Sequence, residues 1–221
     1  LSGGALTLQR AEIERTTSAG LVAYAAENSC GGEGARPCGD AGLQLEDVKV
    51  TGTRPDPLGR MGMGLAAVDG ARVTALRLLA DENHGAGVLV VDDPARIDAT
   101  GPDRSRSSLQ DITVTNTRLS LGADDMESGD GIALVNGAAV TVERFALRDN
   151  ARVGLLVGGT SDGHQDSAFF KDGQITGHAI GVSVAYGWMD LERDLDNVRS
   201  FDNQIDLSSS ETNLPGMGPL P

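Results

Sequence analysis

Hydrophobic and polar residues alternate in short runs along most of this chain. In one run Val140 and Val142 lie on the same side of an extended chain, and Phe145 and Leu147 continue the pattern after a shift of one residue. Alternation with a period of two is typical of a strand with one buried face. The shift predicts a single bend near Glu143.

The residues that follow predict a tight turn and another strand. Asp149-Asn150 is typical of a turn, because Asn tolerates the left-handed region and hydrogen-bonds its own backbone. Gly154 then opens a third short run, Leu155–Val157. Three short strands separated by tight bends, within about 23 residues, are the pattern of one coil of a parallel β-helix.

The same pattern repeats along the chain. Its anchor is a Gly followed by an aliphatic residue, with another apolar residue two positions further on. The anchors are Gly20-Leu21, Gly64-Leu65, Gly87-Val88, Gly131-Ile132, Gly154-Leu155, Gly181-Val182 and a last copy without Gly, Gln204-Ile205-Asp206-Leu207. Successive anchors lie 44, 23, 44, 23, 27 and 23 or 24 residues apart. A step near 23 is one coil, and a step of 44 is one coil with about 21 inserted residues.

Upstream of each anchor the chain contains further runs with a period of two. They are Leu6/Leu8 with Ile13, Leu43/Leu45 with Val48/Val50, Val73 with Leu76/Leu78, Ile112/Val114, and Phe170 with Ile175. We therefore expect an all-β domain over residues 1–207, a solenoid of about seven coils with loop insertions. Leu155, Val182 and Ile132 should share one inner column. Residues 208–221, which are rich in Pro, are expected to form a C-terminal tail or linker.

From residue 5 to residue 207 this repeat resembles the right-handed parallel β-helix proteins of the pectate-lyase-like superfamily. The resemblance implies a right-handed parallel β-helix. It leaves the activity open, because such proteins include lyases and hydrolases of acidic polysaccharides, epimerases, phage tailspikes and adhesins.

The motifs of the pectin-hydrolase branch of that superfamily are present only in part. Asn116-Thr117-Arg118 lacks the Asp of Asn-Thr-Asp, and Gly177-His178-Ala179 lacks the second Gly of Gly-His-Gly. Ala123-Asp124-Asp125 contains the Asp-Asp pair, but it lies too close to the first motif, and Arg-Ile-Lys is missing. The resemblance therefore transfers no catalytic residue to this chain.

The charge and composition of the chain exclude some classes of binding partner. The net charge is −14, with 32 acidic against 18 basic residues. A basic face is needed to neutralise phosphates or to approach an anionic membrane, so we expect neither nucleic acid nor such a surface as a partner. The chain contains no run of about 20 apolar residues, so we expect no membrane insertion. Neighbouring domains of a longer chain are compatible with this composition.

The only two cysteines, Cys30 and Cys38, lie in a Gly-rich loop with seven residues between them. We expect them to form a disulfide, which would stabilise the fold by roughly 2–3 kcal/mol and requires an oxidising compartment. A metal site is the weaker alternative, because no second Cys pair or nearby His completes a ligand set. An extracellular, periplasmic or cell-surface location follows.

An acidic insertion contains the densest group of candidate metal-binding or catalytic side chains in the sequence. Asp124, Asp125, Glu127 and Asp130 place four carboxylates within seven positions of a Gly-containing loop. Such oxygen ligands suit calcium, with Asp124, Asp125 and Asp130 as the metal ligands, although the spacing differs from the twelve-residue calcium loop. Paired carboxylates also serve glycoside hydrolysis. The remaining alternative is a solvated acidic loop.

Other polar and aromatic residues mark further candidates. Trp188 would suit sugar stacking, or it packs at the C-terminal end of the solenoid. His164 lies between two Asp residues in a polar loop. Asn116, Asn150 and Asn203 each follow a strand, so we expect an asparagine ladder.

The insertions of the two 44-residue steps should stand side by side. The spacing from Gly20 to Gly87 equals that from Gly64 to Gly131, 67 residues. We therefore expect the insertion Arg118–Asp130 beside the loop Gly52–Met61, over the compact third coil.

Two function classes remain. The first is a secreted or surface β-helix that binds or adheres, for instance to a polysaccharide or a cell-surface glycan, without catalysis. The second is a lyase or hydrolase of an acidic polysaccharide. The negative charge and the incomplete motifs favour the first class.

Overall fold

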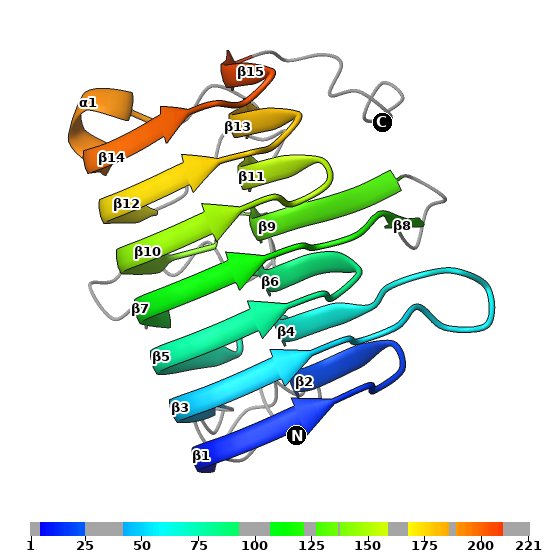
Figure 1. The fold of residues 1–221 in the computed structure, drawn as a ribbon. Coiled ribbons are helices and arrows are strands. Elements are labelled where there is room, and N and C mark those ends of the chain that lie inside the picture. The colour runs from blue at the N-terminus through cyan, green and yellow to red at the C-terminus, as the bar shows by residue number, and fades with distance from the viewer. Residues whose placement is uncertain are drawn as a thin grey trace, which may run out of the picture.

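The computed structural model describes residues 5–24, 42–92, 107–121, 127–136, 138–158, 168–185 and 189–209. Within these ranges the chain is nearly all strand, with one short helix, α1 (Leu191–Asp194). The chain runs from one end of the molecule to the other as a stack of strands, from β1 in blue to β15 in red (Figure 1). The fold is all-β and solenoid-like.

The longer strands form a seven-stranded parallel sheet, in the order β1-β3-β5-β7-β10-β12-β14. Their bounds are β1 (Ala5–Glu14), β3 (Gly42–Thr51), β5 (Arg72–Asp81), β7 (Ser107–Thr115), β10 (Val140–Arg148), β12 (Phe169–Thr176) and β14 (Leu195–Phe201). Each strand pairs with the equivalent strand of the next coil, where a coil is one passage of the chain through both sheets.

A second parallel sheet consists of mostly shorter strands, in the order β15-β13-β11-β9-β6-β4-β2. Their bounds are β2 (Ala19–Tyr24), β4 (Met63–Val68), β6 (Gly85–Val91), β9 (Glu127–Val135), β11 (Val153–Gly158), β13 (Ile180–Ala185) and β15 (Ile205–Ser209). The two-residue strand β8 (Ser120–Leu121) pairs antiparallel with the first residues of β9, outside this order.

The register of the second sheet confirms the anchors found in the sequence. Leu155 pairs with Ile132 on one side and with Val182 on the other, and all three are buried. The last copy differs by two residues from the expected alignment, because Val182 pairs with Leu207 and Ile205 pairs with Ile180. The last strand ends at Ser209, two residues beyond the expected end of the pattern at Leu207.

Every strand of the longer sheet bends at one residue in the left-handed region. In β10 this residue is Arg144, with φ 53°, next to the predicted bend at Glu143. The equivalent residues are Arg10, Asp47, Arg77, Asp111, Asp172 and Asn197, with φ between 51° and 59°. The bend lets the side chains before and after it point inward, and Val140, Val142, Phe145 and Leu147 are all buried.

Aliphatic columns fill the interior, with few rings. Phe145 and Phe170 make an edge-on contact with their ring centroids 6.0 Å apart. The Phe145 ring also lies over Gly173 in the next coil, where a Cβ atom would stand 2.1 Å from the Phe145 Cζ. One large ring therefore requires a residue without a side chain above it.

Candidate functional site

The turn after each long strand is built from two adjacent columns of residues. The first column adopts the left-handed region, as in Glu82 (φ 52°), Asn116 (φ 55°) and Asp149 (φ 53°). The second column points into the turn and is polar: Thr16, Thr53, Asn83, Thr117, Asn150, His178 and Asn203. We call this second column the ladder.

Each ladder amide binds the backbone of the coil before it. The Asn83 Oδ1 accepts the Thr53 N–H at 3.1 Å, and its Nδ2 donates to the Val50 carbonyl at 3.1 Å. Asn150 makes the equivalent bonds to the Thr117 N–H and the Val114 carbonyl. Buried backbone groups at the turn thereby find partners that the sheet does not supply.

The predicted asparagine ladder is confirmed for Asn150 and Asn203 and is wrong for Asn116. Asn116 is the left-handed residue, so its side chain is exposed and donates to the Asp81 Oδ1 at 2.9 Å. Thr117 takes the ladder position instead. Asn83 and His178 belong to the ladder and were not expected there, although each lies three residues after the last inward residue of its strand.

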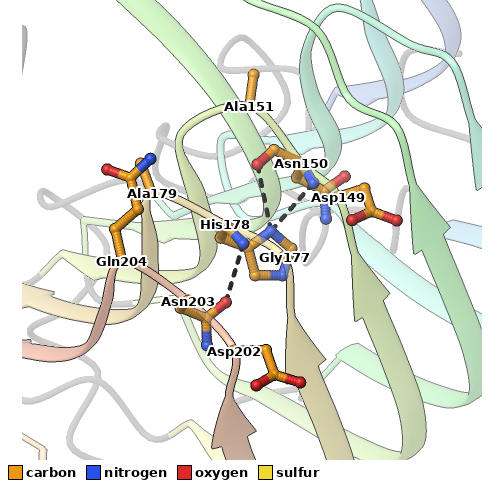
Figure 2. A pocket seen from close by; sticks show the side chains of 9 residues that line it. All are labelled: Asp149, Asn150, Ala151, Gly177, His178, Ala179, Asp202, Asn203 and Gln204. Atoms are coloured by element: carbon orange, nitrogen blue, oxygen red, sulfur yellow. Dashed lines mark hydrogen bonds between the residues drawn. The ribbon is translucent and has the colours of Figure 1, made fainter.

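His178 replaces an Asn in the ladder. Its side chain is only 3% exposed. The Nδ1 accepts the Asn150 N–H at 3.0 Å (Figure 2). The Nε2 donates to the Leu147 carbonyl at 3.1 Å. This pattern assigns the neutral ring with its proton on Nε2, and burial lowers the pKa of His178. The imidazole therefore has a structural role, and the partial Gly-His-Gly motif is explained by the ladder.

A shallow hollow of about 460 Å³ lies over this part of the turn (Figure 2). Its lining comes from three successive coils: Asp149, Asn150, Ala151, Gly177, His178, Ala179, Asp202, Asn203 and Gln204. The hollow exists because Gly177 occupies the left-handed column between two aspartates and contributes no side chain.

Two features of the structure require glycine at position 177: the backbone conformation and the lack of space for a side chain. Its φ is +82°, and a Cβ at this position would stand 2.2 Å from the Asp149 Oδ1. The Asp149 carboxylate therefore leans over Gly177, toward the coil that carries Asp202. The result is two carboxylates on either side of a backbone surface, and the side chain of Gln204 lies on the other side of His178 from them (Figure 2). Each carboxylate oxygen can accept hydrogen bonds from the hydroxyl groups of a ligand.

Only part of the acidic insertion lies within the described residues. Asp124 and Asp125 lie outside them, and Glu127 is exposed. Asp130, which was expected to be a calcium ligand, is 2% exposed, and both of its oxygens bind the guanidinium of Arg152, with 2.8 Å from Arg152 Nε to Asp130 Oδ1. Burial raises the pKa of the Asp130 carboxyl, while Arg152 opposes that rise.

Arg152, the partner of Asp130, is also buried. It is 5% exposed, and its Nη1 finds no hydrogen-bond partner among the described residues. The ion pair stands next to a small apolar cluster that is separate from the main core and consists of Ala133, Val153, Leu156 and Ile180. A pair in such surroundings is a structural element of the coil.

The two insertions do meet, as the equal spacing predicted. The Ser120 hydroxyl donates to the Met61 carbonyl at 2.6 Å. Between them passes Gly85 of the third coil, where a Cβ would lie 2.8 Å from the Ser120 Oγ and 3.0 Å from the Met61 oxygen. The contact leaves room there only for glycine.

Several predicted site residues fall outside the described ranges. These are Cys30 and Cys38 of the disulfide, Asp124 and Asp125 of the calcium site, and Trp188 and His164. Across the described ranges, no group of three or more His, Cys, Asp or Glu side chains could hold a metal ion. The disulfide and the calcium site stay predictions.

Comparison of the chain with protein-family models, curated proteins and solved structures finds no match. No helix in the described part of the chain is long and apolar enough to span a membrane.

Proposed function

We propose that this chain is a right-handed parallel β-helix module, similar in architecture to the pectate-lyase-like superfamily, that binds a glycan without catalysis. The parallel registers, the single bend in each long strand and the polar ladder in the turn support this architecture. We place the module outside the cytoplasm, on the disulfide expected between Cys30 and Cys38.

The hollow over Gly177 carries the proposal of glycan binding. Asp149 and Asp202 bring carboxylate acceptors to an open surface that spans three coils. An extended polymer can lie along the stack and meet equivalent positions at intervals of about 4.8 Å, the spacing between strands. The net charge of −14 favours a neutral polymer over an acidic one.

Hydrolysis is the second candidate, and one observation favours it. Asp149 and Asp202 flank the hollow two coils apart, which corresponds to about 9.6 Å between their backbones. The carboxyl groups of inverting glycosidases lie about 6.5–9.5 Å apart. The ring of His178 offers no third group to this pair, because both of its nitrogens bind the backbone. Binding is therefore the better supported function.

Affinity electrophoresis in gels that contain soluble neutral polysaccharides tests the proposal. Wild-type protein should be retarded by at least one of them, and Asp202→Asn and Gly177→Ala should reduce the retardation. Glu143→Gln is the matched control, because Glu143 lies within β10 and is not part of the lining of the hollow. Equal migration of all four proteins in every gel would refute the proposal.

A reducing-sugar assay on the same polysaccharides separates the two candidates. We expect no release of reducing ends. Release that disappears in both Asp149→Asn and Asp202→Asn would replace the binding proposal by hydrolysis.

A further inference from the structure

We propose that copies of this chain associate end to end, with β1 of one copy pairing with β14 of the next. The pairing would continue the seven-stranded sheet from one molecule into another. It rests on three observations: incomplete burial at the two outermost strands, matching apolar columns, and complementary charges in register.

The inward residues of the first coil are less buried than their equivalents in the second coil. Leu8 and Ile13 of β1 are only partly buried, whereas their register partners Leu45 and Val50 are 3% and 0% exposed. In the described part of the chain, β1 pairs only with β3. An edge strand of this length with apolar residues on one face favours pairing with another strand.

The last long strand shows the same property. Leu195 and Val198 of β14 are partly buried and pack against the main core, whereas Phe170, the register partner of Leu195, is 0% exposed. Among the described residues β14 pairs only with β12. The helix α1 precedes Leu195, at the beginning of the strand (Figure 1).

The register within the chain predicts which residues would meet. If β1 follows β14 as each strand follows the one before it, Leu8 lies beside Leu195 and Ala11 beside Val198. The inward columns then continue from one copy into the next, and the partly exposed apolar side chains of both ends become buried.

The outward columns bring opposite charges together. In the same register Glu12 of one copy meets Arg199 of the next, and Arg15 meets Asp202. Within the chain Glu12 already pairs with Lys49, the equivalent residue of the second coil. Residues of adjacent coils in the column that holds Glu12, Lys49 and Arg199 are therefore close enough for opposite charges to form an ion pair, as Glu12 and Lys49 do.

A third pair follows from the column of bent residues. Arg77 reaches back to Glu46 of the coil before it, with 2.8 Å between Nη2 and Oε1. Arg10 and Asp196 occupy the columns of Arg77 and Glu46. Arg10 of one copy would therefore reach Asp196 of its neighbour in the same way. No pair between β1 and β14 in this register places like charges opposite each other.

The contact is heterologous, because each copy uses two different surfaces. Such a contact generates open chains of molecules rather than closed dimers. Rods that lengthen with protein concentration are the expected product, and their charged contacts should weaken at high salt.

Sedimentation velocity of the wild-type chain over a range of concentrations measures the association. We expect concentration-dependent oligomers, and an association weaker by about tenfold or more in Glu12→Arg and in Arg199→Glu, each of which creates a like-charge contact. An equimolar mixture of these two variants should associate again, because the positive side chain introduced at position 12 of one variant faces the negative side chain introduced at position 199 of the other. The double variant Glu12→Arg/Arg199→Glu should also regain association.

Charge reversals in the middle of the stack are the matched controls. Glu82→Arg and Arg118→Glu change the net charge equally at exposed positions of inner coils, and they should leave the association unchanged. Thermal unfolding of each variant verifies folding. A wild-type chain that is monomeric at every concentration would overturn the proposal, and so would association that ignores the reversals at Glu12 and Arg199.

Discussion

The Nδ1 atom of His178 accepts a hydrogen bond from the backbone N–H of Asn150, one coil earlier, at 3.0 Å. The Nε2 atom of the same ring donates to the Leu147 carbonyl at 3.1 Å. The imidazole thus makes both bonds that an Asn side chain makes in the equivalent positions of other coils. Two predictions follow from this substitution of one polar side chain for another.

Replacement of His178 by Ala should destabilise the fold more than replacement by Asn. His178→Ala leaves a buried N–H and a buried carbonyl without partners, which costs roughly 1–3 kcal/mol for each group. His178→Asn restores the ladder bonds seen at Asn150 and should cost clearly less. Denaturant unfolding measures both variants, and equal losses of stability would contradict the ladder role of the ring.

The stability should also depend on pH through His178. Burial lowers the pKa of the folded-state ring below that of the unfolded chain. It outweighs the opposite effects of the backbone hydrogen bonds to Asn150 and Leu147 and of the nearby carboxylates. The unfolded state therefore binds more protons as the pH falls below about 6.5. The stability that His178 contributes is complete above that pH and is lost progressively as the pH falls toward the folded pKa.

The difference in unfolding free energy between wild type and His178→Asn isolates this effect, because the other titrations cancel. The wild type should lose stability relative to the variant between about pH 7 and pH 5. If the difference in unfolding free energy stayed constant across that pH range, the pKa of His178 would not be lowered in the folded state, and the prediction would be wrong.

Gly177→Ala and Gly52→Ala form a matched pair. Both glycines lie in the left-handed column, with φ +82° and +65°, so an Ala costs about 1–2 kcal/mol at either position. At Gly177 the new Cβ also meets the Asp149 Oδ1 at 2.2 Å, whereas at Gly52 the nearest atom is the Arg15 Cγ at 3.8 Å. Gly177→Ala should therefore unfold at a lower denaturant concentration than Gly52→Ala, and the reverse order would be inconsistent with the hollow described above.

The buried ion pair should matter far more than the exposed ones. Arg152→Met leaves the Asp130 carboxylate buried without its partner and should cost about 3–5 kcal/mol. Arg144→Met removes an exposed pair with Asp111 and should cost less than about 1 kcal/mol. The double variant Asp130→Leu/Arg152→Met should regain most of the loss in denaturant unfolding. A double variant as unstable as Arg152→Met would point to a role of the residues beyond their pairing.

Calcium should stabilise the wild type if the acidic insertion binds it. Asp124 and Asp125 remain the predicted ligands, because the oxygens of Asp130 are bound by Arg152. Millimolar calcium should raise the Tm of the wild type relative to chelator, and it should have no effect on Asp124→Asn/Asp125→Asn. Equal Tm values in all four samples would identify the insertion as a solvated acidic loop.

The sequence alone determined the columns. A Gly before an aliphatic residue recurred often enough to align Leu155 with Ile132 and Val182, and the break in alternation located the bend within one residue of Arg144. Both signals are local. The alternation of a strand and the break in it at a left-handed residue are visible in residues that are adjacent in the sequence. The contact between the two insertions followed from the same repeat spacing.

Only the tertiary structure decided what the polar residues do. The difference between Asn116, which is exposed, and His178, which is buried in the ladder, depends on which residue of the turn adopts the left-handed region. Asp130 resembles Glu127 in the sequence, but Arg152 of the next coil binds it and Glu127 is exposed. These roles depend on contacts between coils, 22 to 36 residues apart along the chain. The stacking of one coil on another determines which side chains meet. The residues adjacent in the sequence therefore do not predict the partner of a polar side chain.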